Sequence, residues 1–256
     1  METLGKCGSI PKIVHQIWLG KAEPPLKWMK SWQDFCRKYN WEYKLWRDSD
    51  IQQFGLKNAE VYSEATSYQK KSDIARYEIL HRFGGMYCDC DMVWLGKDLS
   101  KYIPLEKNMF IGVQEYPGWM HIGSPYLCNG FFICPPRHNI LERCIEKISK
   151  NDYTFMERFK GAWSETGPVL LNNSVKEGVI ILPYYYVFPK DFHYQQGVED
   201  PCKFKNDALV FTYNGMDYPH KKKEKKYNWY VAVCVVIVVF LLLTVLRKIR
   251  KIQNWV

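Results

Sequence analysis

The feature that most limits how this chain can fold is an uncharged run of eighteen residues, Trp229 to Leu246. At about 1.5 Å of rise per residue, a helix over this run would be roughly 27 Å long, close to the hydrocarbon thickness of a bilayer. Basic clusters flank it at 221–226 and 247–251, and a buried core helix would have to bury both of them. We therefore predict a transmembrane helix over 229–246, a basic juxtamembrane linker over 221–228 and a basic tail over 247–256.

The net charge of +9 is concentrated at this same end of the chain. Residues 219–256 contain nine Lys or Arg and one acidic residue, whereas residues 1–218 contain 27 basic and 26 acidic residues. The basic flanks favour anionic headgroups, and a nearly neutral remainder gives no electrostatic support to nucleic-acid binding. No signal peptide is visible, so we expect a single-pass tail anchor, for example in the endoplasmic reticulum or Golgi, with residues 1–220 on the cytosolic side.

Residues 1–220 alternate between strand-like and helix-like patterns. Short runs rich in β-branched and aromatic residues predict strands at 12–18, 41–46, 86–88, 92–95, 109–113, 130–134, 179–182 and 208–213. Apolar residues at helical spacing predict helices near 26–39, 72–83, 138–149 and 168–176, with a short helix after Asp48. The alternation predicts an α/β sheet in one domain, with a long loop over 184–207.

Two Asp-x-Asp pairs stand in different contexts. Asp48 and Asp50 lie where a helix should start, so helix capping explains them. Asp89 and Asp91 follow an apolar strand, and the carboxyl ends of strands are where open α/β sheets bind ligands. Two carboxylates there can hold Mn²⁺ or Mg²⁺, and the cation can bridge a diphosphate. The second pair is therefore the candidate metal site.

Asp73 and Arg76 are three residues apart on a predicted helix, so their side chains share a face. An exposed ion pair of little energetic value is the simple interpretation, and the spacing alone favours it. The functional interpretation is a nucleotide clamp, with Asp73 on ribose hydroxyls and Arg76 on the phosphates or ordering the acidic motif.

Several motifs, in order, resemble the Och1-like glycosyltransferases of family 32. They are the runs IPKIVHQIWLG at 10–20, WEYKLW at 41–46, SDIARYEIL at 72–80 and FGGMYCDCD at 83–91. The last two form the most specific block, which the glucosylating clostridial toxins share, including the sixteen-residue step from Asp73 to Asp89. Weaker similarities continue at Asn129-Gly130 and Thr166-Gly167-Pro168, so the resemblance covers about residues 10–185.

The resemblance implies a GT-A type, Rossmann-like sheet that binds a nucleotide sugar, GDP-mannose or a UDP-sugar, with a divalent metal and retention at the anomeric carbon. It implies that Trp18 stacks on the nucleobase and that Asp73 and Arg76 contact the donor. Asp89 would hold ribose and metal, and Asp91 would ligate the metal. It also implies transfer of a sugar, mannose above all, to a glycan or to a sphingolipid or other lipid-linked acceptor. Tyr87 is interpreted as a packing residue.

The C-terminal part departs from the family pattern. Family members often carry a His-His pair followed by Ser-Trp, whereas this chain has FTYNGMD at 211–217. Four residues are the candidates to replace the missing groups: His193, Asn214, Asp217 and His220. The departure leaves open a catalytically inactive, membrane-bound protein that binds nucleotide sugars or glycans. A metal-dependent phosphohydrolase would need a nucleophile or a second metal cluster, and the sequence shows neither.

Overall fold

The computed structural model describes residues 9–115, 126–151, 153, 161–176, 178–189 and 208–213. Its strands are β1 (Ile13–Ile17), β2 (Glu42–Trp46), β3 (Gly85–Cys88), β4 (Met92–Trp94), β5 (Phe110–Gln114), β6 (Leu127–Cys134), β7 (Val179–Leu182) and β8 (Val210–Thr212). Its α-helices are α1 (Leu26–Tyr39), α2 (Asp48–Phe54), α3 (Ala59–Glu64), α4 (Tyr68–Phe83), α5 (Asn139–Lys150), α7 (Ala162–Glu165) and α8 (Pro168–Ser174). Short 3-10 turns are Leu99–Lys101, Leu105–Lys107 and Tyr184–Tyr186.

Six strands form one mixed sheet in the order β2-β1-β3-β6-β5-β7. Strands β1, β2 and β3 are parallel, β6 is antiparallel to both β3 and β5, and β7 is parallel to β5. A separate antiparallel pair joins β4 to β8. The predicted α/β class is therefore confirmed for the described residues, with a mixed sheet.

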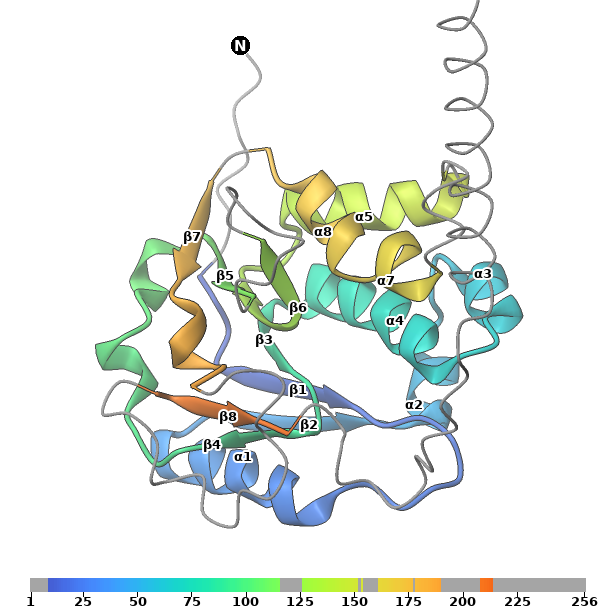
Figure 1. Cartoon of the computed structure of the whole chain (residues 1–256). Helices are drawn as coiled ribbons and strands as arrows, with labels where there is room; N and C mark the ends of the chain where they lie inside the picture. The colour runs from blue at the N-terminus through green and yellow to red at the C-terminus, as the bar shows by residue number, and fades with distance from the viewer. Residues whose placement is uncertain are drawn as a thin grey trace, which may run out of the picture. The chain divides into compact units, whose positions relative to one another are not determined.

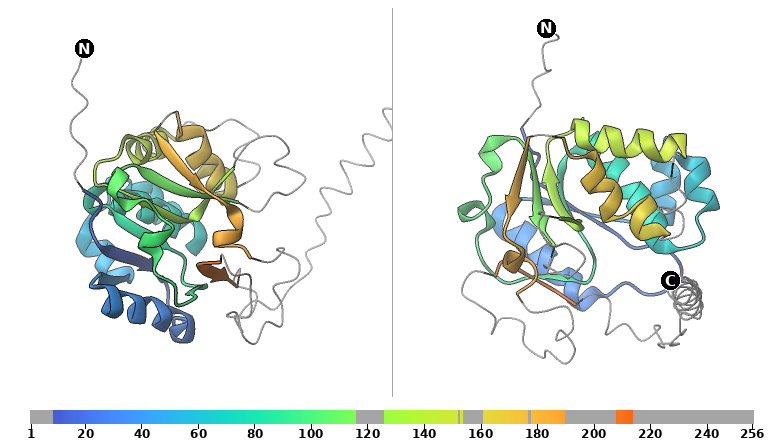
Figure 2. Two further views of the ribbon diagram at one scale, coloured as in Figure 1. Left: turned by 90° about the vertical axis from the view of Figure 1, so that its left-hand side faces the viewer. Right: turned by 45° about the horizontal axis from the view of Figure 1, so that its top comes forward.

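Helices cover both faces of this sheet, as Figures 1 and 2 show: α4, α5, α7 and α8 gather on one face and α1 lies on the other. One apolar cluster packs α4, α5 and α8 against the sheet, with Tyr77 and Phe132 fully buried in it. A second cluster lies under α1, where Trp32 and Phe35 pack with Phe131. Burying both faces gives the domain its core.

The chain leaves β1 and enters β3 over opposite faces of the sheet. Helix α1 connects β1 to β2 on one face, whereas α4 leads into β3 on the other, on the far side of β1. In open α/β sheets, ligands bind in the crevice at the carboxyl ends of the strands where the strand order reverses in this way. The residues that follow β1 and β3 therefore lie where a ligand can enter.

Two glycines set the turn from α4 into β3. Gly84 has φ +65° and closes the helix, with its amide donating to the Leu80 carbonyl at 2.8 Å. Gly85 has φ +95°, and a Cβ there would lie 2.7 Å from the Ile13 carbonyl oxygen of β1. Only glycine fits both positions without strain, so the pair fixes β3 against β1.

The predicted transmembrane helix, its basic flanks and the tail lie outside the described residues. Among the residues that the structure does describe, no helix is long and apolar enough to cross a bilayer.

Candidate functional site

The backbone of Asp89 is held at the carboxyl end of β3 by both neighbouring strands. Its amide donates to the Gly130 carbonyl of β6 at 2.9 Å. Its carbonyl accepts from the Gln16 side chain of β1 at 3.2 Å, and Gln16 in turn accepts a bond from the Tyr43 hydroxyl at 2.8 Å. Gln16 is fully buried. The position of the first motif aspartate is thus set by three strands besides its own.

The two carboxylate oxygens of Asp89 have different surroundings. Oδ1 accepts from the Tyr87 hydroxyl at 2.7 Å and lies 3.3 Å from Arg76 Nη2. Oδ2 faces Gly130, where an added Cβ would lie only 2.5 Å away. The side chain is 37% exposed. One oxygen therefore orients the group, and the side chain stays accessible to a ligand.

Arg76 joins the two acidic positions of the specific block. Its Nη2 lies 3.2 Å from Asp73 Oδ1, and its Nη1 donates to the Asn129 carbonyl at 2.7 Å. The guanidinium also stacks 4.4 Å from the centre of the Tyr87 ring. The side chains of Asp73 and Arg76 are only 9% and 5% exposed. The prediction of an exposed ion pair, which their spacing favours, is therefore wrong, because the pair is buried against β6 and Tyr87.

The Asp73 carboxylate accepts hydrogen bonds from residues that are far away in the sequence. Asn129 Nδ2 donates to its Oδ1 at 2.8 Å, and the Thr166 hydroxyl donates to its Oδ2 at 3.1 Å. Burial raises the pKa of Asp73 to about 6, although Arg76 opposes the shift. Burial lowers the pKa of Arg76, but Asp89, Tyr87 and Asp73 together outweigh it and raise the pKa above its usual value, so the guanidinium stays charged. A fixed positive charge thus lies directly behind Asp89.

Asp91 lies where the C-terminal strand of the described residues meets the motif. Strand β8 pairs with β4, and the next amide, that of Tyr213, donates to the Asp91 carbonyl at 2.9 Å. The ring of Trp28 stacks on Tyr213 at 4.6 Å between centroids. The described segment 208–213 therefore ends beside Asp91. The four candidates for the missing histidines, His193, Asn214, Asp217 and His220, lie outside the described residues.

Trp18 follows β1, beside the motif. Its amide donates to the Trp46 carbonyl, and its indole Nε1 donates to the Ala22 carbonyl at 2.7 Å. The thiol of Cys90 donates to the neighbouring Ile17 carbonyl at 3.3 Å, so Cys90 points into the sheet between the two aspartates. Trp18 is half-buried. Its stacking on a nucleobase stays a prediction.

The donor set of Asp89 and Asp91 fits a hard divalent cation. Carboxylate oxygens suit Mg²⁺ and Mn²⁺, which keep several positions for water and substrate phosphates. Within the described ranges, no group of three or more His, Cys, Asp or Glu side chains surrounds such an ion. Two protein carboxylates with a diphosphate completing the shell is the arrangement that these residues can support.

Four functional residues of this network were not identified from the sequence as such. Tyr87 was interpreted as packing, yet its hydroxyl holds Asp89. Gln16, Asn129 and Thr166 hold Asp89 and Asp73 through contacts of 56 to 93 positions in sequence. The weak similarities at Asn129-Gly130 and Thr166-Gly167 were the signal that pointed to two of them.

Comparisons with known proteins agree with this geometry. Residues 25–109 match the family described as a glycosyltransferase sugar-binding region containing a DXD motif. Inositol phosphoceramide mannosyltransferase 1 of Schizosaccharomyces pombe is 28% identical over 177 residues, which are 66% of this chain and 52% of that protein. An uncharacterized glycosyltransferase of Acanthamoeba polyphaga mimivirus is 29% identical over 206 residues, 77% of this chain and 76% of that one. The chain thus spans about half the length of the yeast protein.

Among solved structures, one titled PaToxG Glycosyltransferase is similar with a TM-score of 0.49 and 17% identity, over 64% of this chain and 68% of that one. The family match and the curated relatives confirm the predicted resemblance to the family 32 glycosyltransferases.

Proposed function

We propose that this chain, with its confirmed likeness to the family 32 glycosyltransferases, is a metal-dependent, retaining glycosyltransferase that moves a sugar from a nucleotide sugar to a glycan or lipid-linked acceptor. The observation that carries the proposal is Asp89 at the carboxyl end of β3, with one oxygen held by Tyr87 and Arg76 and its side chain accessible. Mannose is the proposed sugar, because the yeast relatives are named as mannosyltransferases.

The proposed roles follow from the contacts. Asp89 and Asp91 would hold Mn²⁺ or Mg²⁺, which supplies charge stabilisation for the leaving diphosphate. Arg76 orders Asp89 and keeps a positive charge behind it, because it is buried against both Asp73 and Asp89. Direct contact of Asp73, Arg76 and Trp18 with the donor is part of the proposal. The GT-A arrangement is proposed in the same way from the mixed sheet and the crevice.

The transfer step needs no protein nucleophile. The acceptor oxygen bonds to the anomeric carbon on the face from which the bond to the diphosphate oxygen breaks. The departing diphosphate takes the proton of the acceptor hydroxyl, so atoms and charges balance. The residues of this chain would hold the acceptor hydroxyl beside the leaving diphosphate, on the same face of the sugar, and such positioning can remove a large part of a reaction barrier.

Membrane attachment through 229–246 is proposed from the sequence alone, and it would place the site near a lipid-linked acceptor. Flotation of the full chain with liposomes, compared with a chain carrying three Asp substitutions in that run, tests it. Co-flotation of both forms would contradict the proposal.

The function is tested by incubating the full chain in detergent with Mn²⁺ and a panel of GDP- and UDP-sugars. We expect hydrolysis or transfer for one sugar nucleotide, GDP-mannose first, and none after Asp91→Asn. Binding of a donor without any turnover would favour the inactive binding protein instead. Retained turnover in a folded Asp91→Asn variant would defeat the assignment of the metal site.

A further inference from the structure

Glu115 is a half-buried residue, with one fully buried carboxylate oxygen, that the proposed mechanism does not use. It follows β5, and its amide donates to the Tyr126 carbonyl at 2.6 Å. Its Oε2 is inaccessible to solvent and has no hydrogen-bond partner among the residues that the structure describes. Asp73, which is also buried, has two donors and a guanidinium. A buried oxygen without a donor is costly, so a group that supplies one should bind there.

Glu115 and Asp89 both bond to the backbone in or next to strand β6, which shows how they lie along it. Glu115 is level with Tyr126, immediately before β6, whereas Asp89 is level with Gly130. The pairing of β6 with β5 shifts register between these two levels, since Gly112 faces Phe132 whereas Gln114 faces Leu127. Between them lies Cys128: burial raises the pKa of its thiol, and the charges of Glu115 and Asp89 raise it further. Both carboxylates therefore lie near the same side chain of β6, one towards each end of the site.

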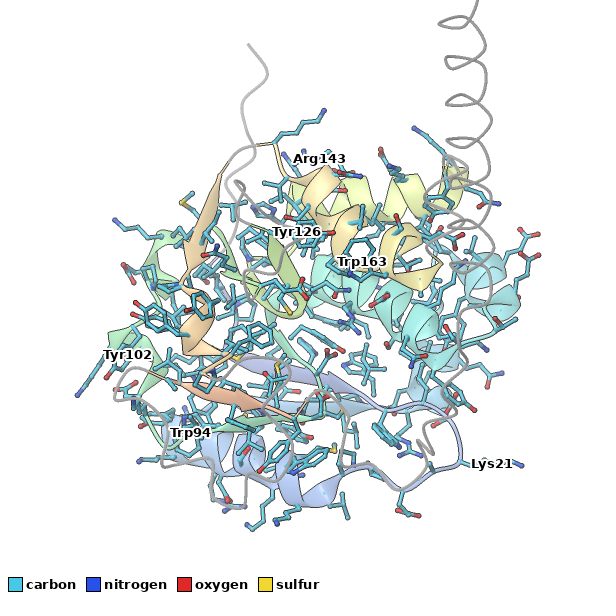
Figure 3. All side chains as sticks on the ribbon, in the orientation of Figure 1. Lys21, Trp94, Tyr102, Tyr126, Arg143 and Trp163 are labelled. Carbon is cyan, nitrogen blue, oxygen red and sulfur yellow. The ribbon has the colours of Figure 1, made fainter. Side chains whose placement is uncertain are left out.

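An aromatic pair lies beside Glu115. The rings of Tyr126 and Trp163 stack at 6.1 Å between centroids and 19° between planes, and Figure 3 labels both beside the start of β6. Trp163 belongs to α7, which is tied to α4 by the Lys70–Glu165 ion pair. The next residue after α7, Thr166, donates to Asp73. The Tyr126–Trp163 pair is thus connected, through α7 and Thr166, to the same buried cluster that orders Asp89.

We propose that Glu115 and the Tyr126–Trp163 pair form a subsite for a hexose ring, with Glu115 accepting hydrogen bonds from its hydroxyls. This inference rests on the proposed function and deepens it. Aromatic rings with a carboxylate nearby suit a ring that has apolar C–H faces and a rim of hydroxyl donors. Because Glu115 and Asp89 both lie near Cys128, this ring would lie beside a diphosphate bound at Asp89. The ring belongs either to the donor or to the acceptor, because both present the same chemistry.

Binding measurements separate the sugar from the nucleotide. Calorimetry on the full chain with Mn²⁺ compares GDP-mannose with GDP and UDP-glucose with UDP, for wild type, Glu115→Gln and Trp163→Ala. If the subsite holds the donor sugar, we expect both variants to lower the affinity for the nucleotide sugar by about tenfold or more. The reason for Glu115→Gln is the loss of a hydrogen bond to a charged group. The affinity for the bare nucleotide should stay unchanged. Glu106→Gln is the matched control, because Glu106 is exposed on a 3-10 turn.

Acceptor kinetics complete the test. If the donor affinities stay unchanged and only the acceptor KM rises by about tenfold, the subsite holds the acceptor sugar, and the proposal stands. If neither changes in folded Glu115→Gln and Trp163→Ala variants, the inference is overturned while the proposed function survives. If the wild type binds sugar nucleotides no better than bare nucleotides and shows no turnover, the proposed function fails with it.

Discussion

The two Asp-x-Asp pairs of this chain share a sequence pattern and differ in what their carboxylates do. Both follow a strand of the parallel part of the sheet, β2 for Asp48 and Asp50, β3 for Asp89 and Asp91. Asp48 accepts from the Gly20 amide at 2.8 Å, and Asp50 accepts from the Arg47 amide and from Lys44, each at 2.9 Å. These bonds use the first pair to fix a loop and the start of α2.

A pair of aspartates therefore does not form a ligand site merely because it follows a strand. The start of α2 is capped, as predicted. The side chain that caps it is Asp50, at the third helical position, and not Asp48. At the second pair the backbone is bound by neighbouring strands, so Asp89 keeps an accessible carboxylate. A binding site requires acidic side chains that local backbone groups leave unused.

The largest expected effect comes from Gly130→Ala. The new Cβ would lie 2.5 Å from Asp89 Oδ2 and 3.1 Å from Met92 Cε, so Asp89 must move. A shift of this size should lower turnover by roughly 100-fold. Gly55→Ala is the control at the end of α2: it meets no atom within 4 Å but has φ +68°, so it should reduce stability and spare turnover. Steady-state kinetics and thermal unfolding of both variants measure this, and equal turnover would refute it.

Tyr87→Phe tests the role of Asp89 Oδ1, the oxygen that the Tyr87 hydroxyl holds in place. It removes the 2.7 Å bond to Asp89 Oδ1 and keeps the ring that stacks on Arg76. Loss of a group that orients a metal ligand typically costs about 10- to 100-fold in affinity or activity, and we expect the lower end. Manganese titrations in the presence of nucleotide measure it. An unchanged manganese affinity would return Tyr87 to a packing role.

Glu115→Gln tests a carboxylate whose Oε2 has no hydrogen-bond donor among the residues that the structure describes. Burial raises its pKa to about 7, so the folded state holds this proton more tightly than the unfolded state does. Stability therefore falls as the pH rises from about 4.5 to 7, and the cost is complete above 7. The variant should raise the free energy of unfolding by about 1 to 2 kcal/mol at pH 8 and leave it unchanged at pH 4. Urea titrations at both pH values decide it; a loss of stability at pH 8 would contradict the burial argument.

Asp50→Asn should show the opposite sign and the smallest effect. The bonds from Lys44 and the Arg47 amide lower the pKa of Asp50, so its stabilisation is present above its ordinary pKa and lost as the pH falls through the folded value. We expect a loss of about 0.5 to 1 kcal/mol at pH 7 that shrinks at pH 3, with turnover unaffected. The same urea series measures it. Reduced manganese binding by this variant would show that the first pair was misjudged.

Local patterns predicted most of the regular elements. Helix α1 was expected at 26–39 and is found at Leu26–Tyr39, because the Pro24-Pro25 start and the apolar spacing are local signals. Helix α4 begins at Tyr68, before the expected residue 72, because Ser67 caps it by accepting from the Lys70 amide. The short helices α3 and α7 were not expected, since too few turns exist for a periodic pattern to show.

The site was predicted in part, for a physical reason. Residues 73, 76, 89 and 91 stand in one contiguous block, so sequence could group them. The groups that complete Asp73 come from β6 and from the turn before α8, and only the folded sheet brings them there. The same holds for the burial of Arg76, which no spacing rule reveals.

The most direct test of the account is manganese binding to the full chain in the presence of GDP or UDP, followed by electron paramagnetic resonance for wild type, Asp91→Asn and Asp50→Asn. We predict one nucleotide-dependent manganese site in wild type and in Asp50→Asn, and loss of that site in Asp91→Asn with the fold intact. Equal manganese binding by all three proteins would contradict the assignment of the second pair as the metal site.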